Sequence, residues 1–298
     1  MRKLYFETLL YGKVLFDEPL SLHTSMKVGG PATLWIEPQT TQQLCCMVRL
    51  CRKAKISVFT IGEGCNIIVG KNGIPDVCIK LASAAFTNIA FNAQYVKSGA
   101  GVLLKNLLKA ASERSLGGGE FLAGIPGTVG GAIFGNAGSQ NKEISSLLEE
   151  ITVIDKAGRL KTIKDKDIKF SYRYSGLSGN IIISALFEFK KNKRKNIDNL
   201  IRKNLREKIK KQDYTAPSAG CIFKNVTRPK ISAGQLIEAC GLKARAIGAA
   251  QVSGRHANFI VNKGNACPDD VLSLIKLVKD EVKTSYGINL EEEVSVIR

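Results

Sequence analysis

Histidine is scarce in this chain, and its scarcity excludes one kind of chemistry. Only His23 and His256 occur among the 298 residues, and neither lies near a second plausible ligand at metal-site spacing. The eight cysteines include no C-x-x-C pair and are too few for a disulfide scaffold of this length. We therefore expect no zinc or non-haem iron site, and a reducing, cytoplasmic environment.

Long apolar runs are also missing. No stretch approaches the roughly 18 apolar residues that a membrane-spanning helix requires. The first eight residues, MRKLYFET, place an acid among apolar residues and lack a small-residue cleavage site, which disfavours a secretory leader. We expect no membrane partner.

Positive charge, in contrast, is abundant. The 44 Lys and Arg outnumber 26 Asp and Glu, for a net charge of +18, and eleven of the basic residues fall within residues 190–211. Apolar residues recur there at helical spacing, which predicts a helix with a basic outer face: Ile197, Leu200, Ile201, Leu205 and Ile209. A solvated face and attraction of phosphate-bearing ligands both fit. A nucleic-acid site would normally add stacking aromatics, and none precedes Tyr214, so we expect no nucleic-acid partner.

Hydrophobic periodicity and turn residues predict an alternation of short strands and helices. We expect strands at residues 32–37, 57–61, 77–81, 94–98, 150–155, 160–163, 181–189 and 294–297, with a hairpin turn at 156–159. We expect a helix at residues 40–55 with Leu44, Val48 and Cys51 facing inward, which makes residues 32–61 a β-α-β segment. A second helix is expected at residues 102–115, ended by Gly117, Gly118 and Gly119. A third is expected at residues 269–286, capped by Asp269 or Asp270 and ended by Gly287.

Six glycines fall within residues 124–138, in GIPGTVGG (124–131) and GNAG (135–138). Glycine is entropically costly unless the backbone must turn tightly or approach another group closely, and successive N–H groups can converge on an anion. No Gly-Lys-Ser/Thr follows, and GEGCN (62–66) precedes the strand-like IIV, so neither common nucleotide-binding fingerprint applies. The segment indicates either tight turns or a nucleotide-type cofactor on an uncommon fold.

Seven motifs in order carry a specific resemblance. They are HTSMKVGGPA (23–32), GEGCN (62–66), EFLAGIPGTVGG (120–131), YRYS (172–175), SAGCIFKN (218–225), HANFIVN (256–262) and EEEV (291–294). This set resembles the MurB family, FAD-dependent reductases that convert UDP-N-acetylglucosamine enolpyruvate to UDP-N-acetylmuramate with NADPH. The short stretch between Arg173 and Cys221 resembles the family's second type, which lacks an extra substrate-covering loop.

The resemblance implies an α+β fold. Two FAD-binding subdomains of the vanillyl-alcohol-oxidase (PCMH) type are expected at residues 1–75, joined by a C-terminal strand at 288–298, and at residues 76–192. A C-terminal α+β substrate domain is expected at residues 193–287. The resemblance also implies FAD and NADPH as cofactors and a UDP-sugar as substrate, and we expect a monomer.

The same resemblance implies the cofactor-binding residues. These are Gly62, Gly64, Cys65, Asn66, Gly124, Ile125, Pro126, Gly127, Thr128, Gly130, Gly131, Asn136, Ala137 and Gly138. Cys65 stands where the family often has serine, but contacts from this loop are expected through the backbone, so FAD binding should tolerate the change.

Three residues match the family's catalytic positions. Arg173 matches the arginine whose guanidinium would hold a carboxylate as its charge grows. Cys221 matches the proton donor, often serine in the family, and a thiol with a reference pKa of about 8.5 is far more acidic than a hydroxyl. Glu293 matches the glutamate of the last motif, and a shifted alignment of that motif would assign Glu291 or Glu292 instead.

Four further residues are candidates for substrate contact. Lys224 and Asn225 follow Cys221 in the same motif and would meet a diphosphate or carboxylate. Tyr172 and His256 would line the site, but a tyrosine or histidine beside a strand is often only packed and hydrogen-bonded. Without the family frame, Cys221 would be a core cysteine and the three glutamates a solvated charge run.

Two other functions are compatible with parts of the sequence. A different FAD-dependent oxidase or dehydrogenase could use the same cofactor scaffold, although the histidine expected for a covalent flavin near the glycine loops is missing. A basic nucleic-acid-binding protein would be colourless and would bind with strong salt dependence.

Overall fold

The computed structural model describes residues 12–227 and 230–298, which form two compact units. Of the described residues, unit 1 comprises 12–16, 34–62 and 76–207, and unit 2 comprises 17–33, 63–75, 208–227 and 230–298. The expectation about a secretory leader rests on residues 1–8, which lie outside the described part. The division into domains at residues 75, 192 and 287 stays a prediction.

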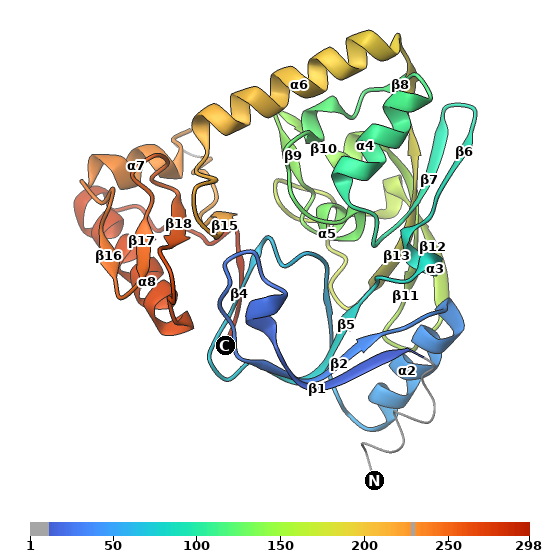
Figure 1. Cartoon of the computed structure of the whole chain (residues 1–298), viewed down its shortest axis with the longest axis horizontal. Helices are drawn as coiled ribbons and strands as arrows, with labels where there is room; N and C mark the ends of the chain where they lie inside the picture. The colour runs from blue at the N-terminus through green and yellow to red at the C-terminus, as the bar shows by residue number, and fades with distance from the viewer. Residues whose placement is uncertain (1–11, 228–229) are drawn as a thin grey trace. The chain divides into compact units, whose positions relative to one another are not determined.

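The helices and strands confirm the expected α+β composition (Figure 1). The helices are α2 (Thr41–Lys53), α3 (Ala84–Thr87), α4 (Leu104–Glu113), α5 (Val129–Phe134), α6 (Arg194–Lys211), α7 (Ala233–Ala239) and α8 (Pro268–Tyr286). The strands are β1 (Lys13–Pro19), β2 (Pro31–Glu37), β3 (Val58–Ile61), β4 (Ile67–Val69), β5 (Ile74–Lys80), β6 (Ile89–Asn92), β7 (Tyr95–Gly99), β8 (Leu116–Gly117), β9 (Gly138–Ser139), β10 (Lys142–Glu143), β11 (Leu148–Ile154), β12 (Leu160–Lys164), β13 (Ile181–Glu188), β14 (Lys190–Lys191), β15 (Ser218–Cys221), β16 (Ala246–Ile247), β17 (Ala250–Val252), β18 (Phe259–Asn262) and β19 (Ser295–Ile297).

The predicted β-α-β segment forms as expected. Thr40 caps α2, with its side chain accepting from the Gln43 N–H while the Gln43 side chain bonds back, a reciprocal arrangement that satisfies two otherwise unpaired donors. The apolar stripe of α2 is buried as predicted. Strand β3 then pairs in parallel with β5, within a four-stranded sheet ordered β1-β2-β5-β3.

A five-stranded sheet of unit 1 has the order β12-β11-β13-β7-β6, and its neighbouring strands pair antiparallel. The predicted hairpin joins β11 to β12. The Asp155 side chain stabilises its turn by accepting hydrogen bonds from the N–H groups of Arg159 (3.0 Å) and Ala157 (2.8 Å). These bonds, with the side chain of Lys161, hold the pKa of Asp155 well below its usual range.

Helix α4 ends earlier than the glycines predicted. It stops at Glu113, and the chain turns at Ser115, which has a positive φ of 58°. Gly117 instead pairs with Lys190 between β8 and β14. A Cβ on Gly119 would lie 2.9 Å from the Phe189 ring, so this glycine is needed for close packing and does not end the helix.

In unit 2, a sheet ordered β15-β18-β17-β16 packs against α8 (Figure 1). The predicted cap of α8 is displaced: Cys267 is the N-cap, Pro268 is the first helical residue, and the Asp270 carboxylate accepts from the Cys267 N–H at 3.0 Å. Gly287 ends the helix in the left-handed conformation, as predicted. Strand β19 pairs in parallel with β4, so the end of the chain returns to residues 67–69.

The basic helix α6 forms, but its apolar stripe is narrower than predicted. Ile197 is buried, whereas Leu200, Leu205 and Ile209 are each at least 40% exposed. The centre of the inner face is Asn204, which donates to the Glu120 carbonyl and accepts from Gln140. None of the helices in the described ranges is both long and apolar enough to cross a membrane.

Candidate active site

The glycine-rich segment of unit 1 forms the turn that leads into α5. The Thr128 hydroxyl caps α5 by accepting from the Gly131 N–H at 3.3 Å. Within the described residues, the N–H groups of Gly124, Gly127 and Thr128 have no hydrogen-bond partner in the protein. Gly127 has a φ of 115°, which only glycine adopts readily. The segment therefore presents unsatisfied donors that suit an anionic group such as a pyrophosphate.

The surroundings of two glycines indicate whether a flat or phosphorylated cofactor fits against the glycine-rich segment. A Cβ on Gly131 would meet only the Thr128 hydroxyl, at an ordinary 3.5 Å, and Gly131 has no positive φ, so neither packing nor backbone geometry requires glycine. Gly62 differs, because its Cβ would lie 2.6 Å from the Thr128 hydroxyl, so glycine lets the two loops meet. The open space at Gly131 therefore permits a bound cofactor to approach the backbone closely.

Arg173 lies in a two-residue turn closed by hydrogen bonds between Ser171 and Tyr174 in both directions, at 2.9 and 3.0 Å. Its φ is 57°, a conformation that costs a non-glycine residue on the order of 1 kcal/mol or more and that often marks a functional site. The guanidinium lies 5.1 Å from the ring centre of Tyr172 and donates to the Gly138 carbonyl at 3.2 Å. Arg173 is thereby attached to the end of the second glycine motif.

In unit 2, the loop after β3 is held against the N-terminal motif. Gly64 has a φ of 61°, and a Cβ there would lie 2.2 Å from the His23 carbonyl. The Ser25 hydroxyl donates to the carbonyls of Gly64 (3.2 Å) and Ser218 (2.7 Å), so it connects this loop to the start of β15. Cys65, which follows Gly64 in this loop, is half-buried.

The chain segments that carry Cys221 and Glu293 pair with each other although 72 positions separate the two residues in the sequence. The Glu293 N–H donates to the carbonyl of Ile222, the residue after Cys221, at 2.8 Å. The Asn66 side chain donates to the Glu293 carbonyl at 3.2 Å, and the Asn66 carbonyl accepts from Ser295. Three of the predicted motifs therefore meet at one point of unit 2.

Asn258 is a residue that sequence reasoning did not single out. It is 3% exposed, its side-chain oxygen accepts from the Phe223 N–H, and its side-chain nitrogen donates to the Phe223 carbonyl. These bonds hold the segment after Cys221 in place. Only its position inside HANFIVN could have indicated it.

The three consecutive glutamates differ in their surroundings. Glu291 pairs with Lys224, and Glu292 pairs with Lys279 at 2.8 Å. Burial opposes ionisation of Glu292, but the Lys279 ammonium, a backbone hydrogen bond and the charge of Arg298 together lower the pKa of this carboxyl. The two glutamates that precede Glu293 are thus each paired with a lysine, which favours the assignment of Glu293 to the site.

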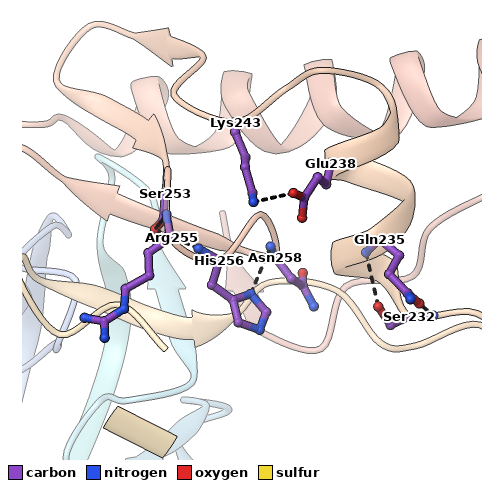
Figure 2. A network of polar contacts seen from close by, with 8 residues as sticks. All are labelled: Ser232, Gln235, Glu238, Lys243, Ser253, Arg255, His256 and Asn258. Atoms are coloured by element: carbon purple, nitrogen blue, oxygen red, sulfur yellow. Dashed lines mark hydrogen bonds and ion pairs between the residues drawn. The ribbon is translucent and has the colours of Figure 1, made fainter. Parts of the chain in front are cut away.

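The remaining candidates surround the same part of unit 2. The Asn225 side chain accepts from the Ala233 N–H at 3.1 Å. Figure 2 shows the His256 ring beside the Lys243–Glu238 ion pair, with its Nδ1 accepting from the Asn258 N–H at 3.2 Å. Burial is the main cause that lowers the pKa of His256, so the ring is neutral at physiological pH and offers Nε2–H as a donor.

No group of three or more potential metal ligands occurs in residues 12–227 and 230–298. The predicted residues fall into two sets. Unit 1 carries the glycine-rich segment with Tyr172 and Arg173, and unit 2 carries the loop after Gly62 with Cys221, Lys224, Asn225, His256 and Glu293.

Two known protein families match parts of this chain. A family described as "FAD binding domain" matches residues 32–164, and one described as "UDP-N-acetylenolpyruvoylglucosamine reductase, C-terminal domain" matches residues 212–297. The reductases of that name from Clostridium botulinum (strain 657 / Type Ba4) and Clostridium kluyveri are 40% and 39% identical, over 95% of this chain and 92% and 93% of theirs. The crystal structure of the Thermus caldophilus enzyme superposes with a TM-score of 0.83 at 32% identity, covering 97% of this chain and 100% of that one. The chain belongs to the UDP-N-acetylenolpyruvoylglucosamine reductase family of FAD-dependent oxidoreductases.

Proposed function

We propose that this protein reduces UDP-N-acetylglucosamine enolpyruvate to UDP-N-acetylmuramate with NADPH, as a step of peptidoglycan precursor synthesis. The observation that supports the proposal is the hydrogen bond between the Glu293 N–H and the Ile222 carbonyl, which brings the Glu293 backbone to the residue that follows the candidate proton donor Cys221. The names of the matching relatives supply the substrate class.

Reduction of an enolpyruvyl ether needs a hydride at the β-carbon, stabilisation of the charge that grows on the carboxylate, and a proton at the α-carbon. Bound FAD supplies the hydride chemistry, with NADPH as the source of electrons. The protein's own side chains are left with the other two tasks.

Arg173 binds and orients the substrate carboxylate. A guanidinium presents paired donors to a carboxylate, and the interaction strengthens as the negative charge grows in the transition state. Its turn has a fixed backbone, with two hydrogen bonds and a positive φ, so the side chain begins from a defined position. Tyr172, whose ring faces the guanidinium, lines the same place.

Cys221 donates the proton to the α-carbon. It is half-buried at the end of β15, after Gly220, whose φ of 77° turns the chain. Glu293 orients the proton transfer or polarises the enolpyruvyl group, and Asn66 holds its backbone from the other side. A positioned general acid of this kind contributes roughly 10²–10⁴-fold to the rate.

The cofactor is held by backbone groups. The free N–H groups of Gly124, Gly127 and Thr128 suit a pyrophosphate, and the open space at Gly131 admits close approach. On unit 2, the loop at Gly64, Cys65 and Asn66 is the corresponding contact in the family pattern.

The diphosphate of the UDP-sugar is the proposed ligand of Lys224 and Asn225. Lys224 is paired with Glu291 in the protein alone, so substrate would compete for a lysine that is already positioned and desolvated in part. His256 is neutral and contributes a hydrogen-bond donor without positive charge.

An anaerobic absorbance scan tests the function. The purified protein should show the flavin bands, lose them on addition of NADPH, and regain them on addition of UDP-N-acetylglucosamine enolpyruvate. A protein that stays colourless with added FAD would overturn the proposal. Bleaching without recovery would indicate a different flavin enzyme on the same scaffold.

We also expect a cytoplasmic monomer without a nucleic-acid partner. Light scattering of the holoenzyme checks the oligomeric state, and fractionation of cells checks the location.

A further inference from the structure

The fully buried residue Asn136 lies beneath the turn that carries Arg173. Its side chain donates to the Glu143 carboxylate at 2.6 Å and to the Ser171 carbonyl at 3.0 Å, and its oxygen accepts from the Ser145 N–H at 3.4 Å. An asparagine amide has two donor hydrogens, so both are used inside the protein. Asn136 also has a φ of 43°, which asparagine tolerates better than most residues.

Two further bonds join the same two segments. The Ser175 hydroxyl, 2% exposed, donates to the Phe134 carbonyl at 2.7 Å, and the Arg173 guanidinium donates to the Gly138 carbonyl at 3.2 Å. Residues 171–175 are thus attached to residues 134–138 at three points. Asn136 makes the middle one of these three contacts, and its buried side chain bonds directly to the backbone of the turn at the Ser171 carbonyl.

The family pattern had indicated Asn136 as a cofactor contact. Because the side chain is 0% exposed and its donors are satisfied by Glu143 and Ser171, it has no donor left for a ligand. Its bonds lead instead to the residue that precedes Tyr172 and Arg173. The chemistry of the side chain is therefore that of a support for the turn.

We infer that Asn136 is a positioning residue for Arg173: its amide fixes the Ser171 carbonyl and so holds the turn that aims the guanidinium at the substrate carboxylate. This inference rests on the proposed role of Arg173. Glu143 holds the amide in the orientation that points its second hydrogen at Ser171.

The test compares the binding of two ligands to the oxidised holoenzyme by calorimetry, without NADPH and hence without turnover. UDP-N-acetylglucosamine enolpyruvate carries the carboxylate, and UDP-N-acetylglucosamine lacks it. The affinity for the enolpyruvyl compound divided by the affinity for UDP-N-acetylglucosamine isolates the contribution of the contact between the carboxylate and Arg173. Asn136→Ala should lower this ratio about tenfold while leaving the affinity for UDP-N-acetylglucosamine and the FAD content unchanged.

A double-mutant cycle shows whether Asn136 acts through Arg173. Arg173→Ala should lower the ratio at least as far, and Asn136→Ala should cost nothing further in that background. The matched control is Asn204→Ala, because Asn204 is also a buried amide of unit 1 with two side-chain bonds, but these lead to Glu120 and Gln140. Its ratio should equal that of the wild type.

Should Asn136→Ala not fold, Asn136→Asp combined with Glu143→Gln replaces it. The exchanged pair can still bond, but the carboxylate that this variant carries at position 136 cannot donate to the Ser171 carbonyl, so the ratio should again fall about tenfold. An unchanged ratio in the foldable variant, or losses that add fully in the cycle, would overturn the inference alone. An unchanged ratio in Arg173→Ala would overturn the proposed role of Arg173, and the inference with it.

Discussion

The Glu293 N–H donates a 2.8 Å hydrogen bond to the Ile222 carbonyl, and this contact brings the last motif of the chain to the residue that follows Cys221. The two segments continue to pair, since the Lys224 N–H donates to the Glu291 carbonyl at 2.9 Å. The pairing fixes the register of the glutamates relative to the thiol, so Cys221 and Glu293 can be tested separately from their neighbours.

Replacing Cys221 should separate the two halves of the reaction. Cys221→Ala removes the proposed proton donor but no group that NADPH requires, so the flavin should still be reduced while product formation falls about 10²–10⁴-fold. Cys221→Ser should retain more activity than the alanine variant. Stopped-flow absorbance follows both steps, with exposed Cys267→Ser as the control. Slow flavin reduction in Cys221→Ala would contradict the proton-donor role.

Neutral replacements of the three glutamates should reveal the register. Glu293→Gln should lower turnover more than tenfold with little loss of stability, because it removes a carboxylate next to the reacting centre. Glu291→Gln removes an ion pair whose acid is 72% exposed, so we expect a change in unfolding free energy of at most about 1 kcal/mol. Glu292→Gln should affect the contact with Lys279 and spare turnover. A larger turnover loss in Glu291→Gln or Glu292→Gln than in Glu293→Gln would shift the assignment.

Local sequence patterns were sufficient to predict helices whose buried residues recur at helical spacing. The stripe of Leu44, Val48 and Cys51 predicted α2 and its inner face, and Gly287 predicted the end of α8. The family assignment came from the order of motifs. It is confirmed by the comparisons, whereas the roles of individual site residues stay predictions.

Long-range polar contacts could not be predicted, because no local pattern encodes them. Asn258 supports the segment after Cys221, Asn66 holds the Glu293 backbone, and Asn136 supports the Arg173 turn, each across 35 or more positions. In the same way, Asn204 occupies the inner face of α6, where the apolar pattern predicted a wider stripe. A buried amide is interpretable only once its partners are known.

The cap of α8 should give a stability that depends on pH. The backbone N–H of Cys267 is the main cause that lowers the pKa of Asp270, so the carboxylate is favoured in the folded state. Its contribution is therefore present above the unfolded pKa of about 3.9 and is lost as pH falls through the lowered folded value. Asp270→Ala should cost about 1 kcal/mol at neutral pH and much less at strongly acidic pH.

Urea unfolding at both pH values measures the Asp270 effect, and Asp269→Ala is the control. Asp269 lies in the same turn and makes only an exposed pair with Lys71. Its removal should change stability by less than about 1 kcal/mol. A cost for Asp270→Ala that is equal at both pH values would mean that the carboxylate charge is not what stabilises the helix.

Two adjacent glycines provide the sharpest test of the cofactor site, because the structure predicts opposite effects for them. Gly131→Ala meets no close protein atom and adds a better helix former, so the apoprotein should be unchanged or up to about 1 kcal/mol more stable. If FAD approaches this backbone closely, the added methyl should weaken FAD binding about tenfold.

Gly130→Ala places a Cβ 2.9 Å from the Ala100 Cβ, so it should lose about 1–3 kcal/mol of stability before any cofactor is added. Thermal unfolding of the apoproteins and titration of flavin fluorescence separate the two effects. Unimpaired FAD binding by Gly131→Ala would mean that the open space at this position is not where the cofactor lies.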